Sequence, residues 1–248
     1  MSVPLISNLL RLSLATGVIT LASVSSAIAG TLNVDFTKLE GLTGGNPGLT
    51  GVYRADLSNL GFDINSIAIA DSNSAQGGQP GKFSGFDLDA IKISNVLVNN
   101  ATDAKNLPGL DVFDFTPSGT LFTPGIQRSS AEPTGLFGTT GGNIDNSVAT
   151  LAYFDANASA DANAFGLVSL GDGGKVVFNL KNPISNTTPL YLYIGEAGDN
   201  GEVASGQITV SDKPQEVPEP TTLAAVSLLG IYFAANRRKK TKAANFKI

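Results

Sequence analysis

The stretch Ser84–Ser94, SGFDLDAIKIS, alternates apolar and polar residues with the period of a β-strand. Successive side chains of a strand point to opposite faces, so the polar residues Asp87, Asp89 and Lys92 are expected to face water. The apolar residues are expected to face a core, and such a strand needs a second layer to cover that core. The residues expected to face the core are Phe86, Leu88, Ile91 and Ile93.

Further strand-like runs are spread along the chain, and residues typical of tight turns (Gly, Asn, Asp and Pro) separate them. Roughly eight to ten strands over this length predict an all-β fold, a single antiparallel β-sandwich or jelly-roll-like domain. No stretch between the two ends shows a convincing helical period. The further runs are Leu32–Phe36, Phe62–Ile69, Val112–Phe115, Leu151–Phe154, Lys175–Leu180, Leu190–Ile194 and Gln207–Val210.

The boundaries of this β-rich body follow from the composition of its flanks. We assign residues 30–211 to the body and 212–216 to a short linker. Within the body, Leu42–Arg54 and Thr116–Asn146 are rich in Gly, Thr, Pro and Ser, and both are expected to be surface loops.

The charge of the body differs from that of the whole chain. The 248 residues carry a formal charge of −5, but residues 30–213 hold nineteen acidic and nine basic side chains, a balance of −10. Such a surface repels nucleic acid and anionic lipid, and it attracts divalent cations or cationic polymers. We therefore expect no nucleic-acid partner.

The chain contains no cysteine and no histidine. Disulfides are therefore absent, and neither a Ser-His-Asp triad, a Cys-His pair nor an imidazole-held zinc site can be built. We expect a protein that is not an enzyme and needs no cofactor, with calcium as the one candidate ion.

The densest group of oxygen ligands lies near the end of the body and consists of Glu196, Asp199, Asn200 and Glu202. Calcium takes six to eight oxygens from carboxylates, amides and carbonyls, and loops between strands supply them well. The spacing fits neither an EF-hand loop nor a nonapeptide calcium repeat. Asn200–Gly201 between two strand-like runs also fits a type I′ hairpin turn, which is the favoured interpretation.

A carbohydrate-active hydrolase with a carboxylate pair is the alternative function. Asp87 and Asp89 share one strand face with their side chains roughly 7 Å apart, although a solvated outer face is the favoured interpretation. Tyr191 and Tyr193 also share a face, where they form either a small stacking platform for sugars or a core-facing pair.

The N-terminal residues 1–29 have the pattern of a secretory signal peptide. A single Arg11 precedes a largely apolar run, and Ala27-Ile28-Ala29 forms an A-x-A cleavage site before Gly30. We expect a signal helix here and export across the inner membrane.

The C-terminal residues 217–242 contain three physically distinct parts. Val217, Pro218, Glu219 and Pro220 form a stiff, extended tetrapeptide, because proline fixes φ and keeps the residue before it out of the α region. The uncharged run of residues 221–235 predicts a short transmembrane helix. The basic tail of residues 237–242 follows, and by the positive-inside rule it halts translocation and stays cytoplasmic. Its first four cations are Arg237, Arg238, Lys239 and Lys240.

This three-part ending, with Pro218-Glu219-Pro220 at its start, resembles the PEP-CTERM sorting domain of exported bacterial proteins. The resemblance implies an exosortase-like processing enzyme as partner. It also implies a membrane-anchored precursor that is cut near the motif and delivered to the cell surface or the extracellular matrix, where exopolysaccharide is a further candidate partner. An ordinary single-pass anchor is the alternative. Ser84–Ser94 and Leu190–Asp212 are also similar to stretches of an uncharacterised group of proteins with this ending, which implies no activity.

Overall fold

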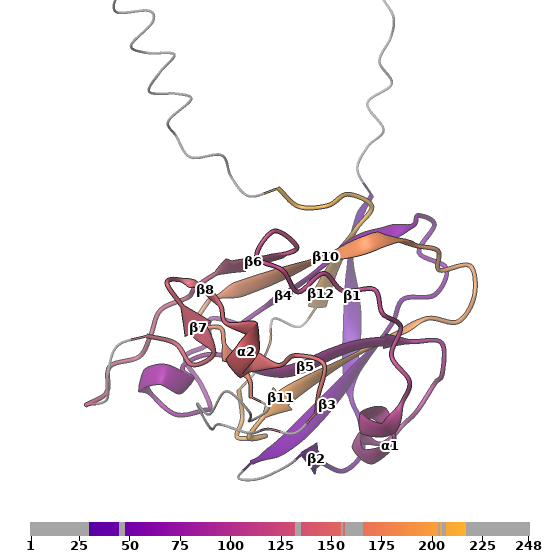
Figure 1. The fold of residues 1–248 in the computed structure, drawn as a ribbon. Coiled ribbons are helices and arrows are strands. Elements are labelled where there is room, and N and C mark those ends of the chain that lie inside the picture. Colours follow the sequence, from indigo (N-terminus) through magenta and orange to yellow (C-terminus); the bar gives the residue numbers. More distant parts are fainter. Residues whose placement is uncertain are drawn as a thin grey trace, which may run out of the picture.

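Strand β1, Thr31–Lys38, joins the two halves of an all-β fold in the computed structural model (Figure 1). Its first part, Thr31–Asp35, pairs with β12, and its last part, Phe36–Lys38, pairs with β3, so β1 passes from one half of the sheet into the other. The structure describes residues 30–44, 48–131, 135–154, 156, 166–202, 204 and 207–216.

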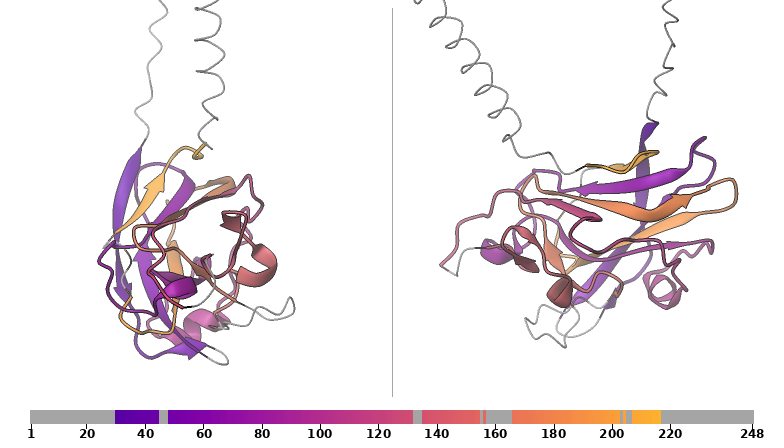
Figure 2. Two further views of the ribbon diagram at one scale, coloured as in Figure 1. Left: turned by 90° about the vertical axis from the view of Figure 1, so that its left-hand side faces the viewer. Right: turned by 45° about the horizontal axis from the view of Figure 1, so that its top comes forward.

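All pairings in the large sheet are antiparallel, and the strand order is β6-β10-β4-β12-β1-β3-β11-β5-β9, with β2 on β3. The sheet is curled, so that its two halves lie over each other (Figures 1 and 2). The strands are β1 Thr31–Lys38, β2 Thr43–Gly44, β3 Leu49–Asp56, β4 Ile64–Ala70, β5 Asp87–Ser94, β6 Thr120–Thr123, β7 Thr139–Thr140, β8 Asn143–Ile144, β9 Val168–Ser169, β10 Lys175–Ile184, β11 Tyr191–Ala197 and β12 Gln207–Ser211. The helices are η1 Gly81–Phe83, α1 Ala101–Asn106 and α2 Asn146–Ala149.

The main core lies between the two halves and is built from the period-2 faces of their strands. β4, β10 and β12 contribute from one half, and β3, β5 and β11 from the other. Phe178 of β10 lies at its centre, where its ring meets those of Phe113 and Phe115 edge-on with centroids 5.7 and 5.9 Å away. Edge-to-face pairs at this spacing add to the stabilisation from burial.

The outer face of the β3-β11-β5 half is also covered, which the sequence did not predict. Phe154 and Tyr193 belong to a second core cluster on this side, and Leu167 and Ala197 to a third. Asp87 and Asp89 on β5 are therefore buried, and the prediction that they face water is wrong. Asp89 accepts hydrogen bonds from the Thr50 hydroxyl at 2.6 Å and from the amide of residue 156 at 2.9 Å.

A β-bulge in β5 explains the break in its alternation between Leu88 and Ile91. Gly195 of β11 pairs with Ala90, but the next residue, Glu196, pairs with Leu88. The bulge adds one unpaired residue to β5 between Leu88 and Ile91, and as a result both of these side chains face the main core.

Six of the predicted strand runs are confirmed, those that fall in β1, β4, β5, β10, β11 and β12. Residues 112–115 and 151–154 are not strands; Phe113 makes only an isolated bridge to Leu180. The prediction that Leu42–Arg54 is a loop is wrong from Leu49 onward, where β3 begins. The other predicted loop, Thr116–Asn146, contains β6 and the hairpin formed by β7 and β8. The alternation that marks a half-buried strand is missing in β3, because its residues at 50–52 are buried on both faces.

In the described part of the chain, no helix is long and apolar enough to cross a membrane. The predicted signal helix and transmembrane helix fall on residues outside the described ranges.

Candidate functional site

Five acidic side chains are buried together at one end of the curled sheet. We call these residues, with Arg128, the acidic cluster. Asp71 follows β4, Asp87 begins β5, Glu196 is near the end of β11, and Glu202 lies in the link between β11 and β12. The five acids are Asp71, Asp87, Asp172, Glu196 and Glu202.

The strand geometry places Glu196 and Asp87 on different faces of the sheet end. Glu196 follows Leu192 and Ile194 at period 2, on the face toward the main core. Asp87 lies on the other face, where it lines a pocket together with Ala197. Glu202 interacts with both, because its Oε2 accepts the Asp87 amide at 3.2 Å and its charge acts on Glu196.

Asp71 and Asp172 are compensated by the protein itself. The Asp71 carboxylate accepts backbone amides from Asn73 at 2.7 Å, Gly173 at 2.8 Å and Phe86 at 3.0 Å. Asp172 lies 3.4 Å from Nε of Arg128. Three amide donors or a nearby guanidinium stabilise an ionised carboxylate.

Asp87, Glu196 and Glu202 are not compensated in this way. They are only 3%, 1% and 3% exposed, and one oxygen of each, Asp87 Oδ1, Glu196 Oε1 and Glu202 Oε1, makes no hydrogen bond. Arg128 comes no closer to Glu202 Oε1 than 3.7 Å, and its Nη1 donates to the carbonyl of Gly77 at 2.7 Å. A buried carboxylate without a partner carries a large desolvation cost.

This burial changes the acidity of all three carboxyls. Burial, and next the charge of Glu202, raise the pKa of Glu196 to about 9. Burial likewise raises the pKa of Glu202 to about 8, against the opposing effect of the Asp87 amide. The pKa of Asp87 is raised well above its ordinary value by burial and then by Glu202. At neutral pH Glu196 and Glu202 therefore favour their protonated form.

Two glycines hold the backbone close over Glu202. A Cβ on Gly78 would fall 1.5 Å from Glu202 Oε1, and a Cβ on Gly77 would fall 2.1 Å from the Gly201 carbonyl carbon. Both glycines have positive φ, +58° for Gly78 and +72° for Gly77, which favours glycine for a second reason. The segment before η1 thus covers the Glu202 carboxyl.

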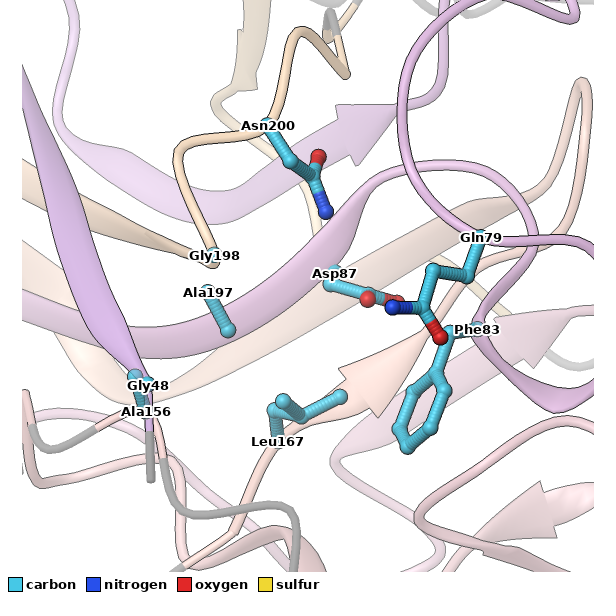
Figure 3. A pocket seen from close by; sticks show the side chains of 9 residues that line it. All are labelled: Gly48, Gln79, Phe83, Asp87, Ala156, Leu167, Ala197, Gly198 and Asn200. Atoms are coloured by element: carbon cyan, nitrogen blue, oxygen red, sulfur yellow. The ribbon is translucent and has the colours of Figure 1, made fainter. Parts of the chain in front are cut away.

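A pocket of about 190 Å³ lies beside the acidic cluster (Figure 3). Asp87, Gln79 and Asn200 are its polar lining residues, and apolar side chains such as Phe83 and Leu167 form other parts of the wall. Figure 3 shows the Gln79 and Asp87 side chains among those that line the pocket. Of the acidic cluster, Asp87 is the residue that lines this pocket.

The structure brings together some of the residues predicted for a calcium site. Glu196 and Glu202 meet, but the Asp199 carboxylate forms a salt bridge with Lys38 at the surface. The Asn200 side-chain oxygen accepts the Gly78 amide at 3.1 Å. In the described ranges, no three acidic side chains are arranged as a ready-made metal-binding group.

The predicted hairpin at Asn200–Gly201 is wrong. β11 pairs with β3 and β5, whereas β12 pairs with β1 and β4, so the intervening segment links the two halves of the sheet. Turn-forming residues mark a change of direction but not the partner of the next strand.

The two tyrosines of β11 do not form an open stacking platform. Tyr193 is fully buried; its hydroxyl donates to the Val96 carbonyl at 2.8 Å and accepts the Val98 amide at 3.0 Å. The core-facing alternative therefore holds for Tyr193, while Tyr191 is half-buried.

Sequence reasoning paired Asp87 with Asp89 and did not join it to Glu196 and Glu202, and it missed Asp71, Asp172 and Arg128. The break in alternation after Leu88 was a detectable signal of an irregular strand, but no pattern placed Arg128 there. Gly30 is described, whereas the remaining predicted targeting residues lie outside the described ranges. These are Ala27, Ala29, Val217, Pro218, Glu219, Pro220, Arg237, Arg238, Lys239 and Lys240.

Comparison with protein-family models, curated proteins and solved structures finds no match to the chain.

Replacing Gly78 with alanine tests how closely the backbone covers Glu202. The φ of +58° strains any L-residue, and the added Cβ meets the carboxyl. We expect a loss of about 2–4 kcal/mol in the free energy of unfolding, measured by urea denaturation. Gly141→Ala is the matched control, because Gly141 has φ +61° and a Cβ added there would have no atom within 4 Å. That change should cost only about 1 kcal/mol. Equal losses would contradict the described packing.

The pH dependence of stability tests the buried carboxyls. The pKa values of Glu196 and Glu202, about 9 and about 8, lie above the ordinary value of 4.5, so the folded chain holds these protons more tightly than the unfolded chain. Their stabilising contribution is fully present below pH 4.5 and is lost as the pH rises toward 9. With a chelator present, we expect on the order of 2–4 kcal/mol less stability at pH 9 than at pH 5.

The control for this measurement is Glu202→Gln, whose amide cannot ionise. Urea denaturation of this variant should show a flatter pH profile and greater stability than the wild type at pH 9. A wild-type profile that stays level between pH 5 and pH 9 would refute the assigned acidities.

Proposed function

We propose that the chain is an exported, non-enzymatic protein of the cell surface or extracellular matrix, sorted by an exosortase-like enzyme that acts at residues 217–220. The C-terminal order of Pro-Glu-Pro motif, uncharged run and basic tail carries this proposal, together with the signal-like N-terminus. The cargo in this proposal is one sandwich or jelly-roll-like domain.

The placement of the two ends of the body supports the proposal. The Asp212 amide donates to the Gly30 carbonyl at 3.0 Å, and Thr31 pairs with Ser211. The described chain therefore begins and ends at one edge of the fold, as also seen at the top of Figure 1. Both targeting segments would join the body at this edge, so the body would be attached to the membrane at one side only.

The acidic cluster lies away from that edge. β12 runs from Gln207 to Ser211, which places its start roughly 13 Å from the edge where Ser211 pairs with Thr31. The link that carries Glu202 precedes Gln207 and bridges to β4 through Asp71 and Ala204. A body anchored at Asp212 would thus present the pocket and cluster away from the membrane.

The first part of the predicted linker, residues 212–215, is hydrogen-bonded to the body. The Asn65 side chain donates to the Asp212 carbonyl at 2.7 Å, and Ser66 donates to that of Lys213 at 2.8 Å. Asn179 and Gln215 exchange two hydrogen bonds. The cleavage motif would therefore start directly after ordered backbone, at a defined distance from the domain.

The hydrolase alternative requires two carboxyls that a sugar can reach. Glu196 and Glu202 are buried, and Asp87 is the one carboxyl among the residues lining the described pocket. This arrangement supports the non-enzymatic proposal.

Processing is tested by replacing both Pro218 and Pro220 with alanine in a host that contains an exosortase. Alanine frees the backbone that proline keeps extended, so recognition should fail. Mass spectrometry of the wild type from the medium and envelope should show loss of the residues after roughly Pro220, while the double variant should keep its tail in the membrane fraction.

The control is Pro214→Ala, just outside the motif, which should be processed like the wild type. Intact wild-type tails in the envelope would support an ordinary membrane anchor and contradict the sorting proposal.

A further inference from the structure

We propose that the Lys38 amine and the Asp199 carboxyl condense to an amide, which cross-links β1 to the segment that follows β11. This modification concerns the folded body and is independent of sorting at the C-terminus, so either proposal can fail alone.

The two reacting groups are in direct contact. The Lys38 amine lies against Oδ1 of Asp199, although the two residues are 161 positions apart in the chain. Gly51 of β3 leaves room for this contact, because a Cβ there would lie 2.9 Å from Asp199 Oδ1 and 3.5 Å from Lys38 Cε. Groups held in a productive orientation react as if at very high concentration, up to about 10⁵–10⁸ M. The fold therefore supplies the proximity that the condensation needs.

Glu196 lies on the same face of the sheet as this pair. In the strand register, Glu196 is opposite Gly51 of β3. Two positions further along β3, Tyr53 is opposite Lys38. Opposite residues point to the same face, as do residues two apart on one strand. Lys38 and Glu196 therefore point to the same side of the sheet, where the Asp199 carboxyl packs over Gly51.

Glu196 is also in the right protonation state to assist the reaction. It is buried, and burial, followed by the charge of Glu202, raises its pKa to about 9. The charges of Asp199 and Lys38 also act on the Glu196 carboxyl, so it lies within range of both. A neutral carboxyl beside the pair can protonate the oxygen that leaves, which an ionised carboxylate cannot do.

The condensation balances without any further reactant. A proton passes from the Lys38 ammonium to the Asp199 carboxylate, which leaves a neutral amine and a neutral acid. The amine nitrogen attacks Cγ of Asp199, the bond from Cγ to the hydroxyl oxygen breaks, and one water leaves. Glu196 gives its proton to the departing oxygen and takes up the proton that the nitrogen releases, so it ends in its starting form.

A second lysine–aspartate pair in the same protein provides an internal comparison. The Lys181 amine lies 2.5 Å from Oδ1 of Asp111. The carboxyl of Asp114 also interacts with Lys181, but it is exposed, and hydrogen bonds from Thr116 lower its pKa. It is therefore ionised at neutral pH and has no proton to give. We expect the pair of Lys181 and Asp111 to remain an ordinary salt bridge.

The cross-link would close a loop from β1 to the end of β11. The chain has no cysteine, so no disulfide can hold these elements together. A covalent bond that persists in the unfolded chain restricts its conformations, and the resulting stabilisation of the folded state grows with the length of the loop. The amide would thus give this protein the stabilisation that disulfides give to many exported domains.

The test is mass spectrometry of the full chain, intact and after proteolysis. We expect the wild type to be one water lighter than the sequence between its observed termini, and its digest to contain a branched peptide that joins Lys38 to Asp199. Lys38→Arg keeps the positive charge but has no amine that can condense, so it should show neither change. Its thermal midpoint should be about 5–15 °C below that of the wild type, because its unfolded chain is not cross-linked.

Glu196→Gln tests the proton donor. The amide preserves the size of the side chain, so circular dichroism should show a folded protein, but bond formation should slow by about 10²–10⁴-fold. The freshly purified variant should therefore contain little of the branched peptide. Bond formation as fast as in the wild type would contradict the role of Glu196.

Lys181→Arg is the matched control and should retain the loss of water, the branched peptide and the wild-type midpoint. A wild-type mass equal to that of its sequence would overturn the proposal. A loss of water that persists in Lys38→Arg would also overturn it, because the water would then come from cyclisation of an aspartate elsewhere in the chain.

Discussion

The burial of five carboxyls at one end of the curled sheet, where Arg128 approaches only Asp172 and Glu202, is the main electrostatic constraint on the structure. Asp71 comes from the β4 half, Glu196 from the β11 half, and Glu202 from the segment that joins them. Backbone amides satisfy Asp71, and Arg128 reaches Asp172, but the other three keep unpartnered oxygens. The stability of this end therefore depends on whether protons neutralise those carboxyls, which makes it sensitive to pH.

The curl of the sheet determines where the acidic cluster lies relative to the two ends of the body. β1 pairs with β12 through Thr31–Asp35 and with β3 through Phe36–Lys38, so one strand serves both halves. The same pairing brings Gly30 and Asp212 together at one edge and leaves the acidic cluster away from it. For a surface protein held at its C-terminal end, as proposed, the attachment and the acidic cluster are thereby separated, and changes at one need not disturb the other.

Alternation in the sequence predicted β1, β4, β5, β10, β11 and β12, although it wrongly assigned the polar positions of β5 to solvent. β3 escaped notice because Thr50 and Val52 are buried on a face that the pattern treats as solvent. The burial of Asp89 was missed for a related reason: its cover includes the backbone of residue 156, far along the chain. The turn-forming residues at Asn200 indicated a change of chain direction, but the hairpin predicted from them assigned the wrong partner strand to β12. Glu196 and Glu202 were named correctly as neighbours, whereas Asp87 and Arg128 needed the three-dimensional arrangement.

The state of the buried carboxyls can be observed directly by titrating the side-chain carboxyl carbons with NMR in chelator. We expect Glu196 and Glu202 to remain protonated at pH 7 and to titrate near pH 9 and pH 8. Titration of both groups near their ordinary value of 4.5 would contradict this expectation, because the end of the sheet would then tolerate their charge without proton or ion.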